Sequence, residues 1–275
     1  MKRVMFILLM LAVTAAVVAG SGCGEKSAET WLEECRQAAS EYLQDGNYLH
    51  FKEVIDYDFE GHFEEQSYEF TQQINIEGDT IFVNRQRYDY REILNSPQVP
   101  EGTQENSFSY LTVDGGTTAF VEGERLSTQL GVTGWVHYTP TGEENRYFDY
   151  GQFIDTLTGT HENLELVGYE DVRGVRCAHL SYTVSGQELM QLRFQQDPSL
   201  EEKYSELDLD EYMEDMDVEL WVGEEDNLPR RITVSQVLSQ EGEGTANVGI
   251  LMEFEGYGQE PPILIEEPAF FTEAG

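Results

Sequence analysis

Positively charged residues are scarce in this chain of 275 residues: Lys and Arg number 16, against 53 Asp and Glu. The formal net charge at pH 7 is therefore −37. A surface of this charge repels nucleic acids and anionic phospholipids, so both are excluded as electrostatic partners. Such a charge favours solubility, but it identifies neither a fold nor a ligand.

Motifs of cofactor, metal and nucleophile chemistry are also missing. The sequence contains no phosphate-binding loop, dinucleotide fingerprint, nucleophile elbow or zinc-type cysteine pair. The five histidines are isolated from one another, and carboxylates are too abundant for one pair to stand out as a glycosidase dyad. The acidic run from Asp208 to Glu219 lacks the glycine and the ligand spacing of an EF-hand loop, which favours a solvated helix face. We therefore expect no enzyme, no metal site and no cofactor.

Cysteine is rare too, and of the three in the chain only Cys35 and Cys177 lie beyond the N-terminal segment. Cys35 falls on the apolar stripe of a predicted helix. Cys177 has the strand parity opposite to the apolar row that contains Leu180 and Tyr182. If that row faces the helix, Cys177 faces away from it. This favours two buried thiols, with a disulfide as the alternative.

The N-terminus has the pattern of an export signal. Lys2 and Arg3 form a positive region, and residues 4–19 form an uncharged apolar run. Sixteen apolar residues fall short of the roughly twenty that span a bilayer, so a retained transmembrane helix is disfavoured. The sequence predicts a signal peptide of the lipoprotein type over residues 1–22.

The residues that follow the apolar run resemble a bacterial lipobox, in which a cysteine becomes the lipidated first residue of the mature protein. Cys23 is that cysteine here, and residues 23–26 form a short tether. Residues 24–26 separate Cys23 from the predicted helix. Three residues reach about 10 Å when fully extended, so we expect the domain to lie close to the extracytoplasmic face of the membrane. Gly20 stands where lipoboxes usually have Leu, so cleavage after Ser21 with plain secretion is the alternative.

Beyond the tether, residues 27–275 show no linker, repeat or low-complexity break, which predicts one domain. Helical periodicity predicts a helix over 27–45, a short helix from Asp149 and a helical region from Pro198 to Met216. Glu77-Gly78-Asp79 is interpreted as a turn between strands. Alternating strands are predicted over 68–76, 80–90, 107–113, 117–122, 134–139, 164–172, 174–184 and 245–254.

The stretch Val218–Leu238 is the clearest β-hairpin in the chain. Its first half alternates apolar residues with Glu219 and Trp221, as in a half-buried strand. Turn residues follow, and Pro229, which has no amide to donate, suits the first position of the return strand.

Several short motifs in this order resemble those of the LppX/LprG-type lipoproteins of Gram-positive bacteria, whose fold is related to that of LolA, the lipoprotein carrier of Gram-negative periplasms. The motifs are LVGYEDVRGV (166–175), ELWV (219–222) with NLPRR (227–231), and FEGYG (254–258) before the tail 263–268. The resemblance implies an α+β fold: a single strongly curved antiparallel sheet, or half-barrel, with a few helices packed on its concave side. In this family a hydrophobic cavity between sheet and helices takes lipid acyl chains.

The resemblance implies a membrane-anchored extracytoplasmic lipoprotein that binds and carries or chaperones a lipid or lipidated protein. The alternative is a non-catalytic envelope adaptor or sensor with the same fold and a filled core, because cavity-lining and core residues show the same alternation. The sequence leaves the oligomeric state open. The candidate cavity-lining residues are Trp31, Leu32, Cys35, Tyr42, Phe70, Ile74, Leu180, Tyr182, Leu220, Val222, Ile232, Val234, Val248, Ile250 and Met252.

Overall fold

The structure is a computed structural model that describes residues 26–42, 46–63, 66–81, 85–97, 102–123, 133–139, 150–159, 161–186, 214–240, 244–261 and 265–273. The signal peptide, Cys23 and most of the predicted helical region from Pro198 lie outside these residues. In chain order the elements are α2 (Ala28–Tyr42), β1 (Tyr48–Phe63), β2 (Gln66–Ile81), β3 (Arg85–Asn95), β4 (Thr103–Val113), the 3-10 turn η1 (Asp114–Gly116), β5 (Thr118–Glu122), β6 (Trp135–Tyr138), α4 (Tyr150–Gly159), β7 (Glu162–Val172), β8 (Val175–Val184), β9 (Met216–Gly223), β10 (Pro229–Gln240), β11 (Gly244–Glu255) and β12 (Phe271–Glu273).

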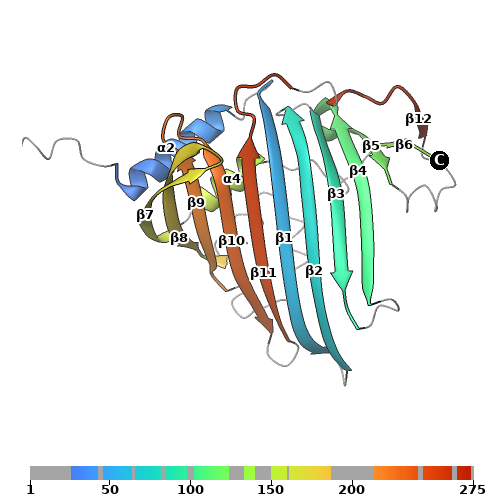
Figure 1. Ribbon diagram of the computed structural model, residues 1–275, viewed down its shortest axis with the longest axis horizontal. Helices are drawn as coiled ribbons and strands as arrows, with labels where there is room; N and C mark the ends of the chain where they lie inside the picture. Colours follow the sequence, from blue (N-terminus) through green and yellow to red (C-terminus); the bar gives the residue numbers. More distant parts are fainter. Residues whose placement is uncertain are drawn as a thin grey trace, which may run out of the picture.

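The strands of the described residues form one unclosed, curled sheet of twelve, in the order β12-β6-β5-β4-β3-β2-β1-β11-β10-β9-β8-β7 (Figure 1). Strand β12 pairs with β6 in parallel, and the other neighbours pair antiparallel. The predicted α+β half-barrel is confirmed. None of the described helices combines the length and the hydrophobicity that crossing a bilayer requires.

Both helices pack on one face of the sheet, which we call the inner face; the other is the outer face. Helix α4 lies behind the strands in Figure 1. Buried residues of α2 and α4, such as Trp31 and Leu157, share one hydrophobic cluster with Leu49 of β1 and Leu220 of β9. Helix α2 begins where Ser27 Oγ accepts a hydrogen bond from Thr30 N at 3.2 Å, which is an N-cap contact.

The predicted hairpin is confirmed as β9 and β10. In its turn, Gly223 N donates to Leu228 O and Asn227 N donates to Gly223 O, each at 2.9 Å. Asn227 has φ 58°, a left-handed conformation that asparagine tolerates better than most residues. Strand β10 begins at Pro229, as expected for a residue without an amide hydrogen.

The turn predicted at Glu77-Gly78-Asp79 is wrong, because β2 continues through these residues to Ile81. Gly78 pairs with Phe51 on one side and with Tyr88 on the other. A Cβ atom at position 78 would lie 2.1 Å from the carbonyl oxygen of Arg87 and 2.6 Å from Tyr88 Cα. Glycine is therefore needed for close approach of β2 and β3, and the predicted strand 80–90 is divided between these two strands.

The outer face has its own small hydrophobic cluster. The prediction that β9 is buried on one face only is wrong at Trp221. Trp221 is buried there with Cys177 and Val172. Its indole Nε1 donates to Glu170 Oε2 at 3.3 Å. Cys177 and Cys35 are both buried free thiols on opposite faces of the sheet, in agreement with the favoured interpretation of two unpaired cysteines.

The predicted helical region also ended too late. Met216 is the first residue of β9 and belongs to the inner-face cluster, so its apolar side chain marks strand parity rather than a helical stripe. The short helix predicted from Asp149 is present as α4, and the predicted hairpin around Asp114-Gly115-Gly116 is present as β4, η1 and β5.

Candidate functional site

The inner face is defined by strand register. Residues directly opposite one another on antiparallel strands share a face. Phe51 pairs with Phe254, Ile55 with Ile250, and Phe59 with Ala246. The odd residues of β1 therefore continue the inner-face row formed by the even residues of β11.

The helix-covered part of the inner face is packed. Trp31, Leu32 and Cys35 of α2 are at most 4% exposed. The predicted cavity-lining residues of the sheet that belong to this buried cluster are Leu180, Tyr182, Leu220, Val222, Ile232, Val234 and Met252. These side chains therefore contact neighbouring side chains on a face shared with the helices. We call this region the upper inner core.

Tyr42, at the end of α2, is half-buried at the rim of this core. Its hydroxyl donates to Tyr48 O at 2.7 Å and accepts a hydrogen bond from Gly258 N at 2.8 Å. Its ring contacts Tyr257 edge-on at 5.0 Å. Tyr42 thus ties α2 to the upper ends of β1 and β11.

A second part of the inner face is mostly apolar, with Gln72 and Gln236 among its residues, and is not fully buried. It lies toward the lower ends of the strands in Figure 1, near the connection between β1 and β2. Phe59 and Phe70 stack there with ring centroids 5.0 Å apart. We call this region the lower inner surface, and its half-buried apolar residues are Ile55, Tyr57, Phe59, Phe70, Ile74, Ile76, Leu238, Ala246, Val248 and Ile250. Four predicted cavity residues, Phe70, Ile74, Val248 and Ile250, are among them.

The sheet thus divides the predicted site residues into two groups. Those on or opposite α2 are packed, whereas those at the lower ends of β2 and β11 retain accessible apolar surface. Half-buried apolar side chains on neighbouring strands keep apolar area that a ligand can cover.

Glu53 is a site residue that the sequence interpretation missed. It lies in the inner-face row of β1 between Phe51 and Ile55, where the core meets the lower inner surface. It pairs with Met252 on β11 and with Ile76 on β2. The residue is only 7% exposed, and burial raises the pKa of its carboxyl to about 7. A charged residue within an otherwise apolar odd-numbered row is the sequence signal that could have revealed it.

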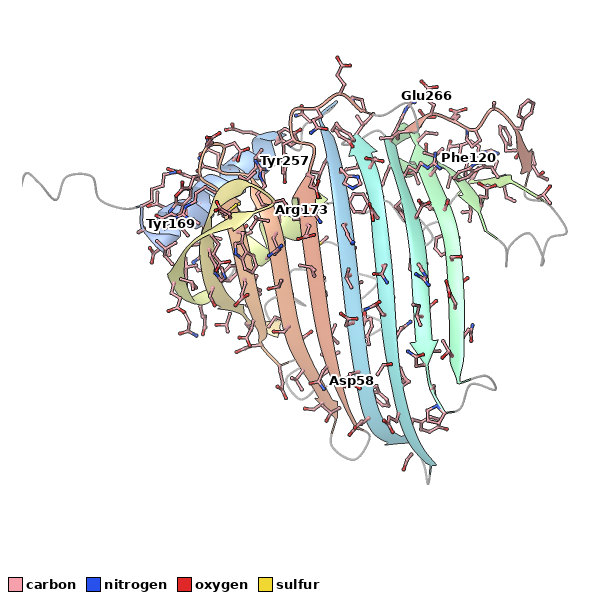
Figure 2. The ribbon with its side chains drawn as sticks, viewed as in Figure 1. Asp58, Phe120, Tyr169, Arg173, Tyr257 and Glu266 are labelled. Carbon is pink, nitrogen blue, oxygen red and sulfur yellow. The ribbon has the colours of Figure 1, made fainter. Side chains whose placement is uncertain are left out.

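Glu253 shows how the same sheet accommodates a buried glutamate on its outer face. It is 9% exposed, and Arg231 Nη2 donates to its Oε1 at 2.7 Å. Arg173, from the turn between β7 and β8, donates to Oε2 (Figure 2). Burial acts to raise the pKa of Glu253, but the hydrogen bonds from the two arginines outweigh it and lower the pKa. Two glutamates of similar burial therefore have pKa shifts of opposite sign.

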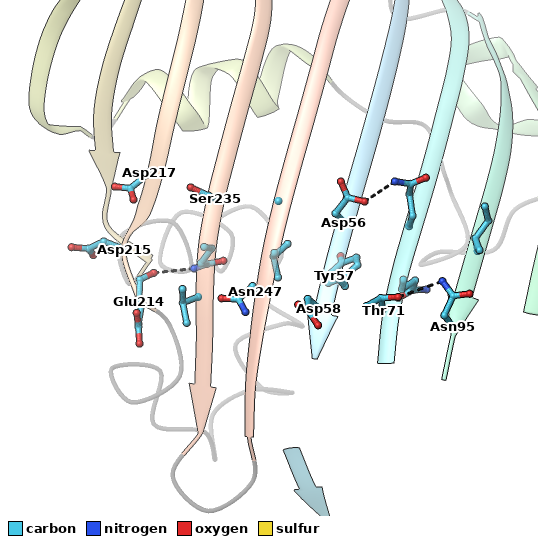
Figure 3. A pocket seen from close by; sticks show the side chains of 17 residues that line it. Asp56, Tyr57, Asp58, Thr71, Asn95, Glu214, Asp215, Asp217, Ser235 and Asn247 are labelled. Atoms are coloured by element: carbon cyan, nitrogen blue, oxygen red, sulfur yellow. Dashed lines mark hydrogen bonds between the residues drawn. The ribbon is translucent and has the colours of Figure 1, made fainter. Parts of the chain in front are cut away.

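An open groove of about 730 Å³ lies on the lower outer face (Figure 3). Asp56, Asp58, Asp215 and Asp217 contribute carboxylates to its lining. Asp56 Oδ1 accepts a hydrogen bond from Gln73 Nε2 at 2.8 Å, as in an ordinary cross-strand pair. No group of three or more potential metal ligands occurs in the part of the chain that the structure describes.

The histidines His50 and His179 each contact a different side chain. His50 Nδ1 lies 3.1 Å from Asp79 Oδ1, and this hydrogen bond raises the pKa of His50. The ring of His179 stacks on Trp221 at 4.2 Å. These contacts are those of single packed side chains, each with its own partner.

Lys26, the first residue that the structure describes, contacts residues of α2 and of the β9–β10 turn. Lys26 Nζ donates to Glu34 Oε2 at 2.5 Å and to Asn227 Oδ1 at 3.1 Å. Its ammonium group also lies 3.9 Å from the ring centroid of Trp31, a cation–π contact. A tether that begins at Cys23 would therefore join the domain beside the β9–β10 turn.

No protein-family model and no curated protein sequence matches the chain. Among solved structures, the chain is similar to LprF from Mycobacterium bovis, with 13% identity and a TM-score of 0.45, over 88% of this chain and 97% of that one. It is also similar to the lipoprotein LppX from Mycobacterium tuberculosis, with 10% identity and a TM-score of 0.35, over 86% and 98% of the two chains. These are proteins of the type that the sequence motifs resemble. Because both TM-scores lie below 0.5, no functional conclusion follows from them.

Proposed function

We propose that this protein is a membrane-anchored extracytoplasmic lipoprotein that binds an acyl chain of a lipid or lipidated protein on its lower inner surface, and carries or chaperones that ligand. One observation supports this most directly: the apolar rows of β1, β2, β10 and β11 stay half-buried where they leave the packed core. Each CH₂ group buried there would contribute about 0.8 kcal/mol with little directional demand. The short sequence motifs shared with LppX/LprG-type lipoproteins support the same function.

A non-catalytic adaptor or sensor is the second candidate, and the packing of α2 favours it. Trp31, Leu32 and Cys35 are buried against neighbours rather than lining a space. In that case the half-buried rows would contact a protein partner instead of an acyl chain. Ligand uptake by the purified protein separates the two candidates.

We expect Val248→Asn to weaken binding of a fluorescent fatty acid about tenfold, which corresponds to about 1.4 kcal/mol. Val248 is half-buried on the lower inner surface, so the amide would replace apolar contact area with a polar group that the acyl chain cannot satisfy. Fluorescence titration of detergent-free protein measures the dissociation constant.

Val237→Asn is the matched control, because Val237 is 38% exposed on β10 and pairs with Asn247 on the outer face. The same substitution there should leave fatty-acid binding unchanged. Equal loss in both variants, or a wild-type protein that shows no saturable uptake, would exclude the carrier and favour the adaptor.

The proposed anchor is tested by Cys23→Ala, which should move the protein from the membrane fraction to the medium. A lipidated cysteine supplies long acyl chains, and their loss removes the contribution of each buried CH₂ to membrane affinity. Partition in Triton X-114 measures the change, and Cys177→Ala, which removes a buried thiol of the folded domain, should stay in the detergent phase. Wild-type protein in the aqueous phase would instead support plain secretion.

A further inference from the structure

Glu53 places a carboxyl group in the inner-face row of β1, between the apolar residues Phe51 and Ile55. Its inner-face neighbours are Phe51 and Ile55 on its own strand, Met252 on β11 and Ile76 on β2, and none of them is charged. No described residue donates a hydrogen bond to its carboxyl group, although the residue is only 7% exposed.

A buried carboxyl group without a partner opposes folding, because its desolvation is not offset by hydrogen bonds or an opposite charge. The same sheet offers a direct comparison in Glu253, which is nearly as buried and is paired with two arginines. Glu53 has no such pair within the described residues. Its hydrogen-bonding capacity is therefore available to a group that comes from outside the fold.

The position of Glu53 indicates what that group is attached to. The row of β1 continues from Glu53 directly into Ile55, Tyr57 and Phe59 of the lower inner surface. An acyl chain on that surface would end with its polar head at Glu53. A head group that pairs with Glu53 would be buried as well, so it has to compensate the charge of the carboxylate.

We propose that Glu53 binds the amino group of an amphiphilic ligand whose acyl chain lies on the lower inner surface. This inference rests on the proposed function and adds the chemistry of the head group. An ammonium group both donates hydrogen bonds to the carboxylate and neutralises it, so that two buried charges satisfy each other. An anionic head would place a second negative charge beside the Glu53 carboxylate, which is unfavourable. The net charge of −37 also attracts a cationic amphiphile to the protein.

The test compares three probes of equal chain length: decylamine, decanol and decanoate, each titrated calorimetrically at pH 8. We expect wild-type protein to bind decylamine at least tenfold more tightly than the other two. Glu53→Gln keeps the shape of the side chain and removes its charge. It should bring decylamine to the affinity of decanol and leave decanol binding unchanged.

Glu60→Gln is the matched control on the same strand. Glu60 is exposed and pairs with Glu69 on the outer face, so Glu60→Gln makes the net charge less negative by the same single unit and leaves the inner rows unchanged. It should preserve the preference for decylamine. If it abolishes the preference as Glu53→Gln does, the preference comes from overall charge and the inference is overturned.

A second arm uses pH. At pH 6 the carboxyl of Glu53 should be largely protonated, and the preference for decylamine should fall severalfold. The other ionisable side chains on the surrounding inner rows are Tyr57 on β1 and Tyr88, Tyr90 and Glu92 on β3. Glu92 is the carboxyl among them and accepts a hydrogen bond from Gln72 Nε2 at 2.5 Å. A pH effect that persists in Glu53→Gln would come from another group and would overturn the inference.

Failure of this inference is distinguishable from failure of the proposed function. If the wild-type protein binds all three probes alike, the lower inner surface takes acyl chains but Glu53 does not select the head. If it binds none of them, the acyl-chain function itself fails.

Discussion

Replacing Glu53 by Gln is expected to raise the free energy of unfolding by about 3 kcal/mol at pH 8 and by almost nothing at pH 4. Burial raises the pKa of Glu53 to about 7 in the folded protein, from an ordinary value of 4.5. Each pKa unit corresponds to about 1.4 kcal/mol, so this difference is worth roughly 3 kcal/mol. Such an effect is a large part of the stability of an ordinary domain.

The sign follows from proton binding. Between about pH 4.5 and pH 7 the folded state holds a proton on Glu53 that the unfolded state has released. The stability that the wild type has below pH 4.5 is therefore lost progressively as the pH rises to about 7. Glutamine at this position does not titrate, so the variant lacks this loss.

Urea unfolding of both proteins at a series of pH values, at constant ionic strength, measures this difference. Titrations shared by wild type and variant cancel, which isolates the contribution of position 53. The exposed Glu60→Gln serves again as the control, because it removes a carboxylate of the same strand that is not buried. A stability difference for Glu53→Gln that does not grow between pH 4.5 and 7 would show that the Glu53 carboxyl is solvated.

Gly78→Ala is expected to lower the free energy of unfolding by roughly 3 kcal/mol, at the upper end of overpacking effects. The added Cβ atom would lie 2.1 Å from Arg87 O and 2.6 Å from Tyr88 Cα, which are backbone atoms of the neighbouring strand. Backbone cannot rotate away as the end of a flexible side chain can. Strand β3 would have to separate from β2 near the middle of the sheet.

Gly249→Ala provides the matched control, because Gly249 is also a strand glycine, on β11, and its Cβ would meet nothing within 4 Å. Its φ angle is outside the left-handed range, so alanine should be tolerated and should change stability by less than about 1 kcal/mol. Thermal or urea unfolding of the two variants gives the comparison. Equal stability of the two variants would mean that β2 and β3 can separate at little cost.

Local patterns predicted the elements whose signals are contained within a few residues. Helix α2 followed from its apolar stripe, and the β9–β10 hairpin followed from its turn residues and Pro229. Gly78 shows the limit of this reasoning. Between Glu77 and Asp79 it has the composition of a turn, but its role depends on the approach of β3, a contact that no local pattern reveals.

The site was predictable in part for the same reason. Alternation placed residues such as Ile74 and Ile250 on the same face as Leu220, and the register confirms that face. Which of them are packed depends on where α2 and α4 cover the sheet, which is a long-range property. Trp221 was assigned to the exposed side of β9 because alternation alone does not show that β7 and β8 bury part of the outer face.

The acidic composition has a local consequence at the β7 end of the described sheet. An unpaired edge strand presents free backbone donors and acceptors, with which a second molecule can extend the sheet. Strand β7 carries exposed Glu162, Glu165, Glu170 and Asp171, and its pairing with β8 shifts register twice. Like charges and an irregular edge both oppose pairing between two copies, which protects an open sheet against aggregation. Salt screens this repulsion, so the protection should be weakest at high ionic strength.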